Sequence, residues 1–165
     1  MPAGFPLPEM EMDMDIYERL KQDHEKQREL GEKILQTQGA SDERKALWHD
    51  YKVELEAHAS AEEQTFYAEL MSHPKASDQT RHSVSEHKDA ADIVEELEEM
   101  DMSSPGWLTR FKQLKHDIEH HLDEEEDDVF SLSRELISDR KARQLAEAFN
   151  QRKPAEVQKE ENEAA

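Results

Sequence analysis

Residues 118–130, Ile-Glu-His-His-Leu-Asp-Glu-Glu-Glu-Asp-Asp-Val-Phe, place a histidine and a carboxylate within a helical apolar stripe. Apolar residues recur at spacings of four and three on both sides of this pair: Trp107, Phe111, Leu114, Ile118, Val129, Leu132 and Leu136. The spacing continues through His121 and Glu125, which lie one helical turn apart, so both are expected to point inward. His120 and Glu124 fall off the stripe and are expected to face solvent. The other histidines that fall off the stripes or in loops are also expected at the surface: His49, His73, His82 and His116. A buried histidine and a buried carboxylate each need a partner, and a metal ion satisfies both.

The same pattern occurs once more, 63 residues earlier in the chain. His58 and Glu62 repeat the pair, and a second glutamate follows each copy. An aromatic residue, Tyr67 or Phe130, stands nine residues after each histidine. Upstream of His58 the stripe contains Leu47, Tyr51 and Leu55. The two copies indicate two repeated pairs of helices.

Each copy is expected to have a helix before it, and each of those helices contributes one further histidine. His24 and His87 are again 63 residues apart, and both lie on or beside an apolar stripe. A single His-x-x-x-Glu pair on an acidic helix is usually an exposed pair of little consequence. The shared phase and repeat favour a metal site instead, with the candidate ligands His24, His58, Glu62, His87, His121 and Glu125.

Capping and helix-breaking residues divide the chain into five predicted helices. They span about 15–37, 42–72, 78–101, 105–137 and 138–152, with caps or stops at Asp15, Gly39, Ser41, Pro74, Ser77, Ser104 and Pro154. Short connections make neighbouring helices antiparallel. The sequence therefore predicts an all-α fold, an up-down-up-down four-helix bundle over 15–137 with a short fifth helix over 138–152. Residues 1–14 are predicted to be a mobile arm and residues 153–165 a disordered tail.

The predicted bundle also brings the candidate ligands to one height. On each helix a ligand lies nine to twelve residues from the end at one shared pole of the bundle. At about 1.5 Å of rise per residue, these heights agree to within roughly one turn.

Composition excludes several classes of function. The 165-residue chain carries a formal net charge of −20, which disfavours nucleic acid and anionic membrane surfaces as partners. It contains no Cys, which excludes disulfides, thiolate chemistry and Cys-ligated iron–sulfur clusters. No window approaches 18 apolar residues and no secretory signal is recognisable, so the sequence predicts a cytoplasmic protein without a membrane span.

The motif set resembles the hemerythrin-like HHE cation-binding family over roughly residues 15–137. The family pattern is a histidine on helices 1 and 3 and His-x-x-x-Glu on helices 2 and 4, here His24, His87, His58 with Glu62, and His121 with Glu125. The resemblance implies a four-helix bundle that holds two non-haem iron ions bridged by the two glutamates. The chain departs from the oxygen-carrying hemerythrins, which have His-x-x-x-His on helix 3, because Ser83 stands four residues before His87. Reversible oxygen transport is therefore disfavoured, and the match is closer to bacterial members associated with nitric oxide, peroxide and iron handling.

Ligand chemistry agrees with iron and leaves manganese and zinc open, because histidine and carboxylate without thiolate suit all three metals. Four histidines and two glutamates leave each of two ions short of six ligands, so a small ligand such as O₂, peroxide or nitric oxide can bind. Tyr51 lies two turns before His58 on the inward stripe. It is either a core aromatic residue or a further phenolate ligand.

Three functions remain open on the sequence. The first is a di-iron protein that binds or turns over a small oxidant as a sensor, scavenger or stress-response protein, with a peroxidase-like, catalase-like or nitric-oxide-related activity if it is an enzyme. The second is an iron-binding or storage module without turnover. The third is a metal-free acidic helical interaction protein, whose buried histidines would need a donor for every lone pair.

Overall fold

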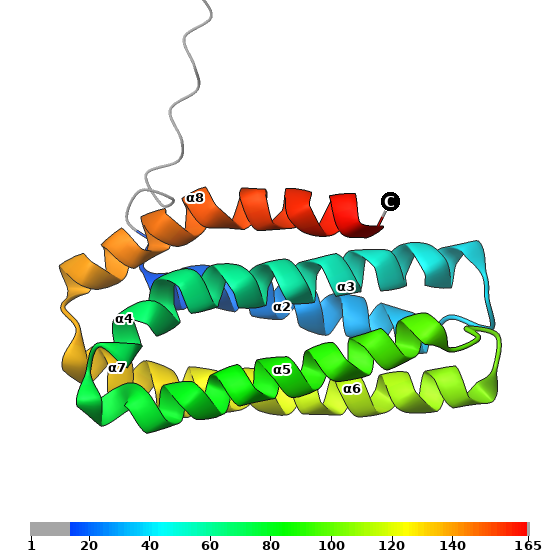
Figure 1. Ribbon diagram of the computed structural model, residues 1–165, viewed down its shortest axis with the longest axis horizontal. Coiled ribbons are helices and arrows are strands. Elements are labelled where there is room, and N and C mark those ends of the chain that lie inside the picture. The colour runs from blue at the N-terminus through cyan, green and yellow to red at the C-terminus, as the bar shows by residue number, and fades with distance from the viewer. Residues whose placement is uncertain (1–13, 165) are drawn as a thin grey trace, which may run out of the picture.

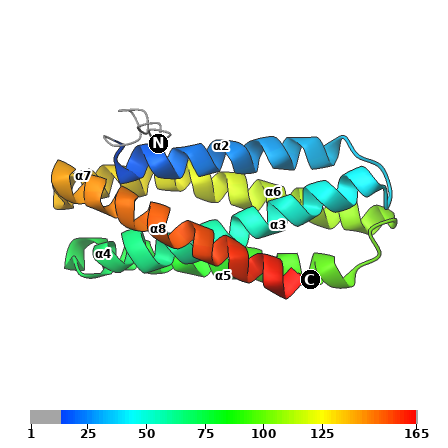
Figure 2. The ribbon, with the colours of Figure 1, turned by 90° about the horizontal axis from the view of Figure 1, so that it is seen from above.

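The computed structural model describes residues 14–164, and its core is a bundle of four long helices (Figure 1). They are α2 (Ile16–Leu35), α3 (Asp42–Glu62), α5 (Ser77–Glu99) and α6 (Pro105–Glu124). Each runs antiparallel to the next, and α8 (Asp139–Ala164) lies along α3 and α2 on the outside of the bundle (Figures 1 and 2). The predicted all-α, up-down-up-down bundle with a fifth helix is therefore confirmed. The predicted N-terminal arm falls, for residues 1–13, outside the described residues.

Most helix boundaries match the predicted caps. Asp15 and Ser41 each accept a hydrogen bond from the backbone N–H three residues later, at 2.9 and 3.1 Å. Gly39 takes the positive φ of 56° that lets the chain turn between α2 and α3. Ser77 is different, because a 3-10 turn, η2 (Pro74–Ala76), precedes α5 and makes Ser77 its first helical residue rather than its cap.

Two of the predicted helices contain a wide π turn that the sequence pattern did not predict. The turns are η1 (Glu63–Tyr67), ahead of α4 (Ala68–Met71), and η3 (Glu125–Val129), ahead of α7 (Phe130–Leu136). A π turn inserts one extra residue and shifts the helical phase, so two successive side chains can face the core. Phe66 and Tyr67 are both buried after the first shift, as are Val129 and Phe130 after the second.

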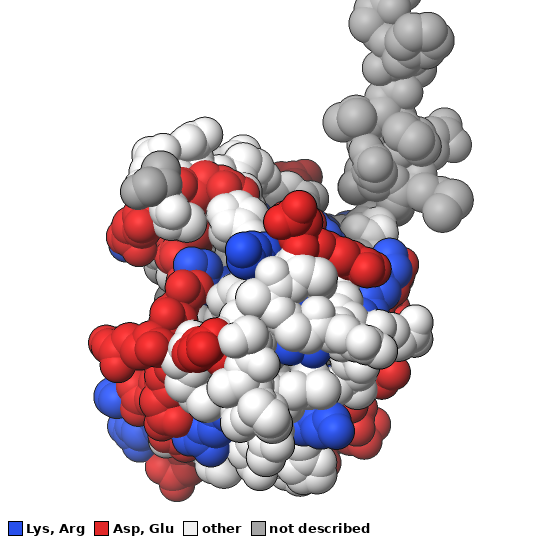
Figure 3. All heavy atoms as spheres, turned by 90° about the vertical axis from the view of Figure 1, so that its right-hand side faces the viewer, with Lys and Arg blue, Asp and Glu red and all other residues white. Residues whose placement is uncertain are grey.

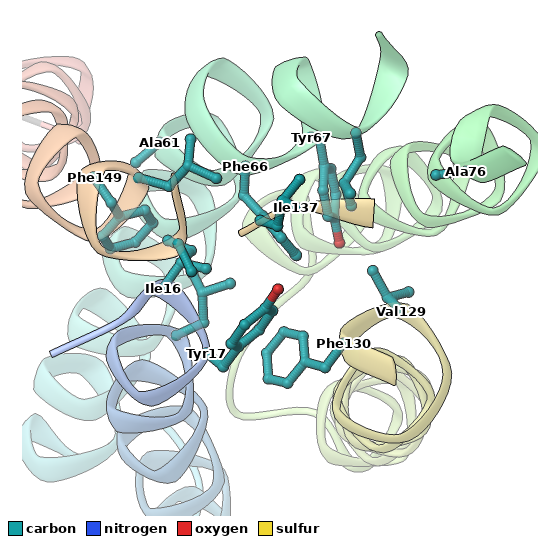
Figure 4. Close-up of a cluster of buried hydrophobic side chains, with 14 residues drawn as sticks. Ile16, Tyr17, Ala61, Phe66, Tyr67, Ala76, Val129, Phe130, Ile137 and Phe149 are labelled. Carbon is teal, nitrogen blue, oxygen red and sulfur yellow. The ribbon is translucent and has the colours of Figure 1, made fainter. Parts of the chain in front are cut away.

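Two apolar clusters fill the bundle, one toward each pole. The first contains aromatic side chains from α2, η1, α7 and α8 (Figure 4): Tyr17, Phe66, Tyr67, Phe130 and Phe149. The second includes Ile34, Trp48, Tyr51, Trp107 and Phe111. On α2, Leu20 belongs to the first cluster and Ile34 to the second, with His24 between them. The polar side chains of the candidate site therefore form a layer between two apolar ones.

The fifth helix is longer than predicted, and the predicted disordered tail is wrong over residues 153–164. Pro154 lacks the N–H that would bond to the preceding turn, which usually stops or kinks a helix. Here α8 continues through it to Ala164, because side chains on both sides are held by the bundle. Lys153 Nζ lies 2.6 Å from a carboxylate oxygen of Glu54, and Gln64 donates to Glu156 at 2.8 Å. No pattern within a single helix indicates these contacts.

Acidic side chains are prominent on the surface, as the net charge of −20 requires. Figure 3 shows the pole at the right of Figure 1, where Asp and Glu gather along one flank. Among the described residues, no helix combines the length and apolar character needed to cross a membrane.

Candidate metal centre

The structure brings all six predicted ligands together inside the bundle. Imidazole Nε2 atoms lie 3.3 to 3.5 Å from glutamate oxygens in the pairs His24–Glu125, His58–Glu62, His87–Glu62 and His121–Glu125. The donor atoms form two groups, His24 with His58 and His87 with His121, and both glutamates belong to each group. Within a group the donor atoms lie within 4.8 Å of one another. The arrangement is two adjacent cation-sized sites that share two carboxylates.

Several polar atoms of this cluster are buried and, within residues 14–164, make no contact with the geometry of a hydrogen bond, although His24 Nε2 lies 3.3 Å from Oε1 of Glu125. They are Nε2 of His24 and of His58, both carboxylate oxygens of Glu62, and Oε1 of Glu125. Leaving one buried polar atom unpaired typically costs about 1–3 kcal/mol. Nitrogen and oxygen donors that converge without partners are what a bound cation satisfies, so the residues fit a metal.

A second layer of carboxylates lies beside the outer nitrogen of each imidazole ring and accepts a hydrogen bond from three of the four. Nδ1 of His58 lies 2.7 Å from Asp23, and Nδ1 of His121 lies 2.9 Å from Glu86. Nδ1 of His24 lies 3.2 Å from Glu126. His87 is held less tightly, with Nδ1 at 3.4 Å from Glu63 and outside hydrogen-bond geometry. A carboxylate on the far ring nitrogen fixes which nitrogen is free to bind a metal and strengthens it as a ligand.

The four supporting carboxylates follow the same arrangement on each helix of the bundle. Each stands next in sequence to a candidate ligand on its own helix but holds the histidine of the following helix. The order runs from Asp23 on α2 to α3, from Glu63 on η1 to α5, from Glu86 on α5 to α6, and from Glu126 on η3 back to α2. They too are 63 residues apart in pairs, which is the signal that could have identified them from the sequence.

Charge balance within the cluster results from these contacts. Burial by itself lowers the pKa of His58, but Glu62 and Asp23 outweigh burial and raise it to about 10. Burial also lowers the pKa of His121, but the carboxylates of Glu125 and Glu86 outweigh burial and raise this pKa to about 10. Without metal these imidazoles therefore hold protons at neutral pH, and protons must leave the cluster before the ring nitrogens can bind a metal.

Tyr67 brings a phenol to the cluster, although the sequence pattern identified it only as a repeated aromatic residue. Its hydroxyl donates a hydrogen bond to Glu125, and its ring stacks on His87 with 5.4 Å between centroids. Phe130, the counterpart in the repeat, stacks on His24 at 6.3 Å. The two halves of the centre are thus alike in shape but differ by one hydroxyl group.

The predicted alternative for Tyr51 is decided in favour of packing. Its ring lies in the second apolar cluster, 5.4 Å from the Phe111 ring and 6.3 Å from the Trp48 ring. Helix phase alone placed it near His58, but the phenol beside the glutamates belongs to Tyr67. The remaining histidines, His49, His73, His82, His116 and His120, all lie outside the buried cluster, as predicted.

A cavity of about 290 Å³ leads to one side of the cluster. His58, His87 and His121 are among its lining residues, and its walls include the apolar side chains of Leu55, Val84, Val94, Ile118 and Leu122. Glu56 and Glu160 are also among its lining residues. Burial and the neighbouring Glu160 raise the pKa of Glu56 to about 8, so this carboxyl group is mostly neutral at pH 7. A cavity of this size admits small molecules.

Comparison with known proteins agrees with this arrangement. Residues 15–133 match the family described as "Hemerythrin HHE cation binding domain". A similar solved structure is that of a hemerythrin HHE cation binding domain-containing protein, the Rv2633c homolog from Mycobacterium kansasii. It shares 28% sequence identity and a TM-score of 0.79, over 88% of this chain and 89% of that one.

Two curated relatives differ in how much of their length this chain covers. An uncharacterised Mycobacterium tuberculosis protein, Rv2633c, is 28% identical over 116 residues, which are 70% of each chain. A DNA nickase of Nostoc is 27% identical over 137 residues, 83% of this chain but only 38% of the nickase. This chain therefore spans about two fifths of the nickase. The family match covers the whole buried cluster of histidines and glutamates. The chain belongs to the hemerythrin HHE cation-binding family.

Proposed function

We propose that the six buried ligands hold a pair of iron ions and that this centre binds or turns over a small oxidant, O₂, H₂O₂ or nitric oxide. The observation that carries the proposal is the sharing of Glu62 and Glu125 by two histidine pairs, with unpartnered buried donor atoms in each. Two bridging carboxylates suit two divalent ions a few ångströms apart. Histidine and carboxylate ligands without thiolate suit iron. Such a pair would supply redox chemistry and open coordination positions.

The protein's own contribution is access, exclusion of water and control of protons. The cavity gives a small molecule a route to His58, His87 and His121, and its apolar walls disfavour bulk water. Gln27 also lines the cavity, and its buried Nε2 has no hydrogen-bond partner among residues 14–164, so it can donate a hydrogen bond to a polar guest. The Tyr67 hydroxyl holds a proton against Glu125, beside the shared carboxylates.

Iron storage is less well supported by this arrangement. The six candidate ligands suffice for two ions, and the cavity beside them, of about 290 Å³, is far smaller than a mineral store. A metal-free interaction protein is opposed by the buried unpartnered donors. The name of the Nostoc relative refers to DNA, but this chain covers 38% of that protein and carries a net charge of −20.

The proposal is tested by adding one oxidant at a time to iron-loaded protein. We expect the visible spectrum to change within one turnover on addition of O₂, H₂O₂ or nitric oxide, with peroxide consumed repeatedly if the protein is an enzyme. Protein carrying zinc in the same sites is the control, because zinc has no redox chemistry. An iron-loaded protein whose spectrum none of the three reagents alters would reject oxidant binding and favour a passive iron-binding module.

The cavity makes a separate prediction about access. Ala91 lines it on the exposed side of α5, so Ala91→Phe is expected to narrow the cavity without disturbing the core. Stopped-flow spectra should show a slower reaction with the active oxidant at unchanged iron content. The control is Ala155→Phe, an exposed site on α8 that does not line the cavity. Equal rates for both variants and the unmodified protein would show that the ligand takes another route.

A further inference from the structure

Four metal-binding side chains that the buried centre does not use as ligands meet on the outer face of α5 and α6. The two helices lie side by side (Figure 1). α5 contributes His82 and Glu86, and α6 contributes His120 and Glu124, each pair one helical turn apart. Both histidines are exposed, in agreement with the surface positions predicted for them. Helix phase alone did not indicate that the two helices bring them to the same carboxylate.

Distances within this cluster match those between ligands of one small cation. His82 Nε2 lies 3.2 Å from Glu124 Oε1 and 3.6 Å from Glu86 Oε1. His120 Nε2 lies 3.6 Å from the other oxygen of Glu124. A tetrahedral ion with bonds of about 2.1 Å separates neighbouring ligand atoms by about 3.4 Å. His82, Glu86 and Glu124 each offer a ligand atom within 4.8 Å of the others. His120 lies beside Glu124 but outside that group, so its side chain must rotate toward the other three to join the ion.

The charges of the cluster also favour a cation. Within residues 14–164, no Lys or Arg forms an ion pair with either Glu86 or Glu124, whose charged partners are histidines. Gln79 donates to Glu124 at 3.2 Å and holds one carboxylate oxygen toward His82. The two carboxylates are about one-fifth exposed, compared with about half or more for the histidines, so the site is open on one side.

We propose that His82, Glu86, His120 and Glu124 form an outer site for a divalent transition-metal ion, separate from the buried centre. Two imidazoles and two carboxylates without thiolate are donors for zinc-like and ferrous ions rather than for calcium or magnesium, which prefer oxygen alone. The open side leaves room for solvent as a further ligand.

The outer site shares one atom with the support of the buried centre. Glu86 Oε1 lies 2.9 Å from Nδ1 of the buried ligand His121 and 3.6 Å from His82 Nε2. An ion bound outside draws on the same oxygen that orients His121. Filling the outer site is therefore expected to shift the visible spectrum of the iron-loaded buried centre. This expected shift rests on the proposed function, whereas the existence of the outer site does not depend on it.

The test is a cobalt titration of the full chain, with the metal content measured beforehand. Cobalt(II) in a tetrahedral nitrogen and oxygen site gives intense visible absorption, and equilibrium dialysis counts the ions retained. Compared with the unmodified protein, His82→Ala/His120→Ala is expected to retain one ion fewer and to lose the tetrahedral bands. The matched control is His73→Ala/Glu69→Ala, which removes a partly exposed i,i+4 pair 3.3 Å apart that no second histidine joins in the part of the chain the structure describes. That variant should bind as many ions as the unmodified protein.

The outcome separates this site from the buried one. If the buried ligands bind no metal, Glu62→Ala/Glu125→Ala leaves the ion count unchanged, but the loss caused by His82→Ala/His120→Ala remains. The outer site is refuted if His82→Ala/His120→Ala retains the same number of ions with the same absorption as the unmodified protein. It is equally refuted if the control pair loses as much, because the ion would then be spread over the acidic surface.

Discussion

Replacing Glu125 with Ala is expected to empty both halves of the buried centre. Its carboxylate lies 3.3 Å from His24 Nε2 and 3.5 Å from His121 Nε2, so each histidine pair loses a shared ligand. Loss of a residue that only supports a metal ligand already costs about 10–100-fold in affinity. Loss of a ligand common to two ions should therefore lower affinity by more than about 100-fold. Iron content after dialysis measures the effect.

Two variants keep this expectation decisive. Asp127→Ala changes an exposed carboxylate in the same π turn and should keep the full iron content. Glu125→Gln keeps the volume of the side chain, so it should lose iron while far-ultraviolet circular dichroism shows a folded bundle. If Glu125→Gln and Asp127→Ala both retain the iron of the unmodified protein, the shared-carboxylate arrangement is wrong.

Replacing Lys153 with Met should weaken both the fold and the metal centre. Lys153 Nζ lies 2.6 Å from Glu54 Oε1 and 2.7 Å from Asp23 Oδ2, and that same Asp23 oxygen accepts from His58 Nδ1 at 2.7 Å. Removing one partner of a buried charge cluster lowers the free energy of unfolding by about 3–5 kcal/mol. We expect a loss at the lower end of this range, because Arg19 and Lys26 also contact the two carboxylates. With Asp23 less well held, metal affinity should fall by about tenfold, the lower end for a supporting residue.

Urea denaturation and a competitive metal titration measure the two effects. Lys159→Met, at an exposed position of α8, should leave both quantities unchanged. Adding Glu54→Leu to Lys153→Met removes a buried carboxylate that has lost its closest cation, and should recover part of the lost stability. A Lys153→Met protein as stable as the Lys159→Met control would show that α8 does not brace the site.

The clustering of the six candidate ligands could be predicted because they share one helical phase with the core. The apolar stripe through Ile118, His121 and Glu125 predicts that these side chains face the core, and this prediction needs no knowledge of the neighbouring helices. Asp23 and Glu86 lie one residue off that phase, where a side chain reaches the next helix rather than the centre. Such contacts depend on how closely and at what angle the helices pack, which no single helix encodes.

The predictions that the structure contradicts also depend on features that the pattern of a single helix does not encode. A π turn changes the phase after Glu62 and Glu125, so extending the α-helical period past these residues misplaces the side chains beyond them. The α-helical period therefore does not predict the contact between Tyr67 and Glu125. Tyr51 lies before the π turn, and its packing in the second apolar cluster depends on the neighbouring helices. A proline usually ends a helix because it lacks the backbone N–H. In α8 the buried contacts of Lys153 and Glu156 outweigh the hydrogen bond that Pro154 cannot make.

The number of iron ions retained per chain tests the central claim most directly. The measurement should use His82→Ala/His120→Ala, so that the outer cluster does not contribute. After anaerobic loading with ferrous iron and dialysis, we expect two iron ions per chain, and none once Glu62→Ala/Glu125→Ala is added. Retention of no iron, or of iron that survives loss of both glutamates, would contradict the account.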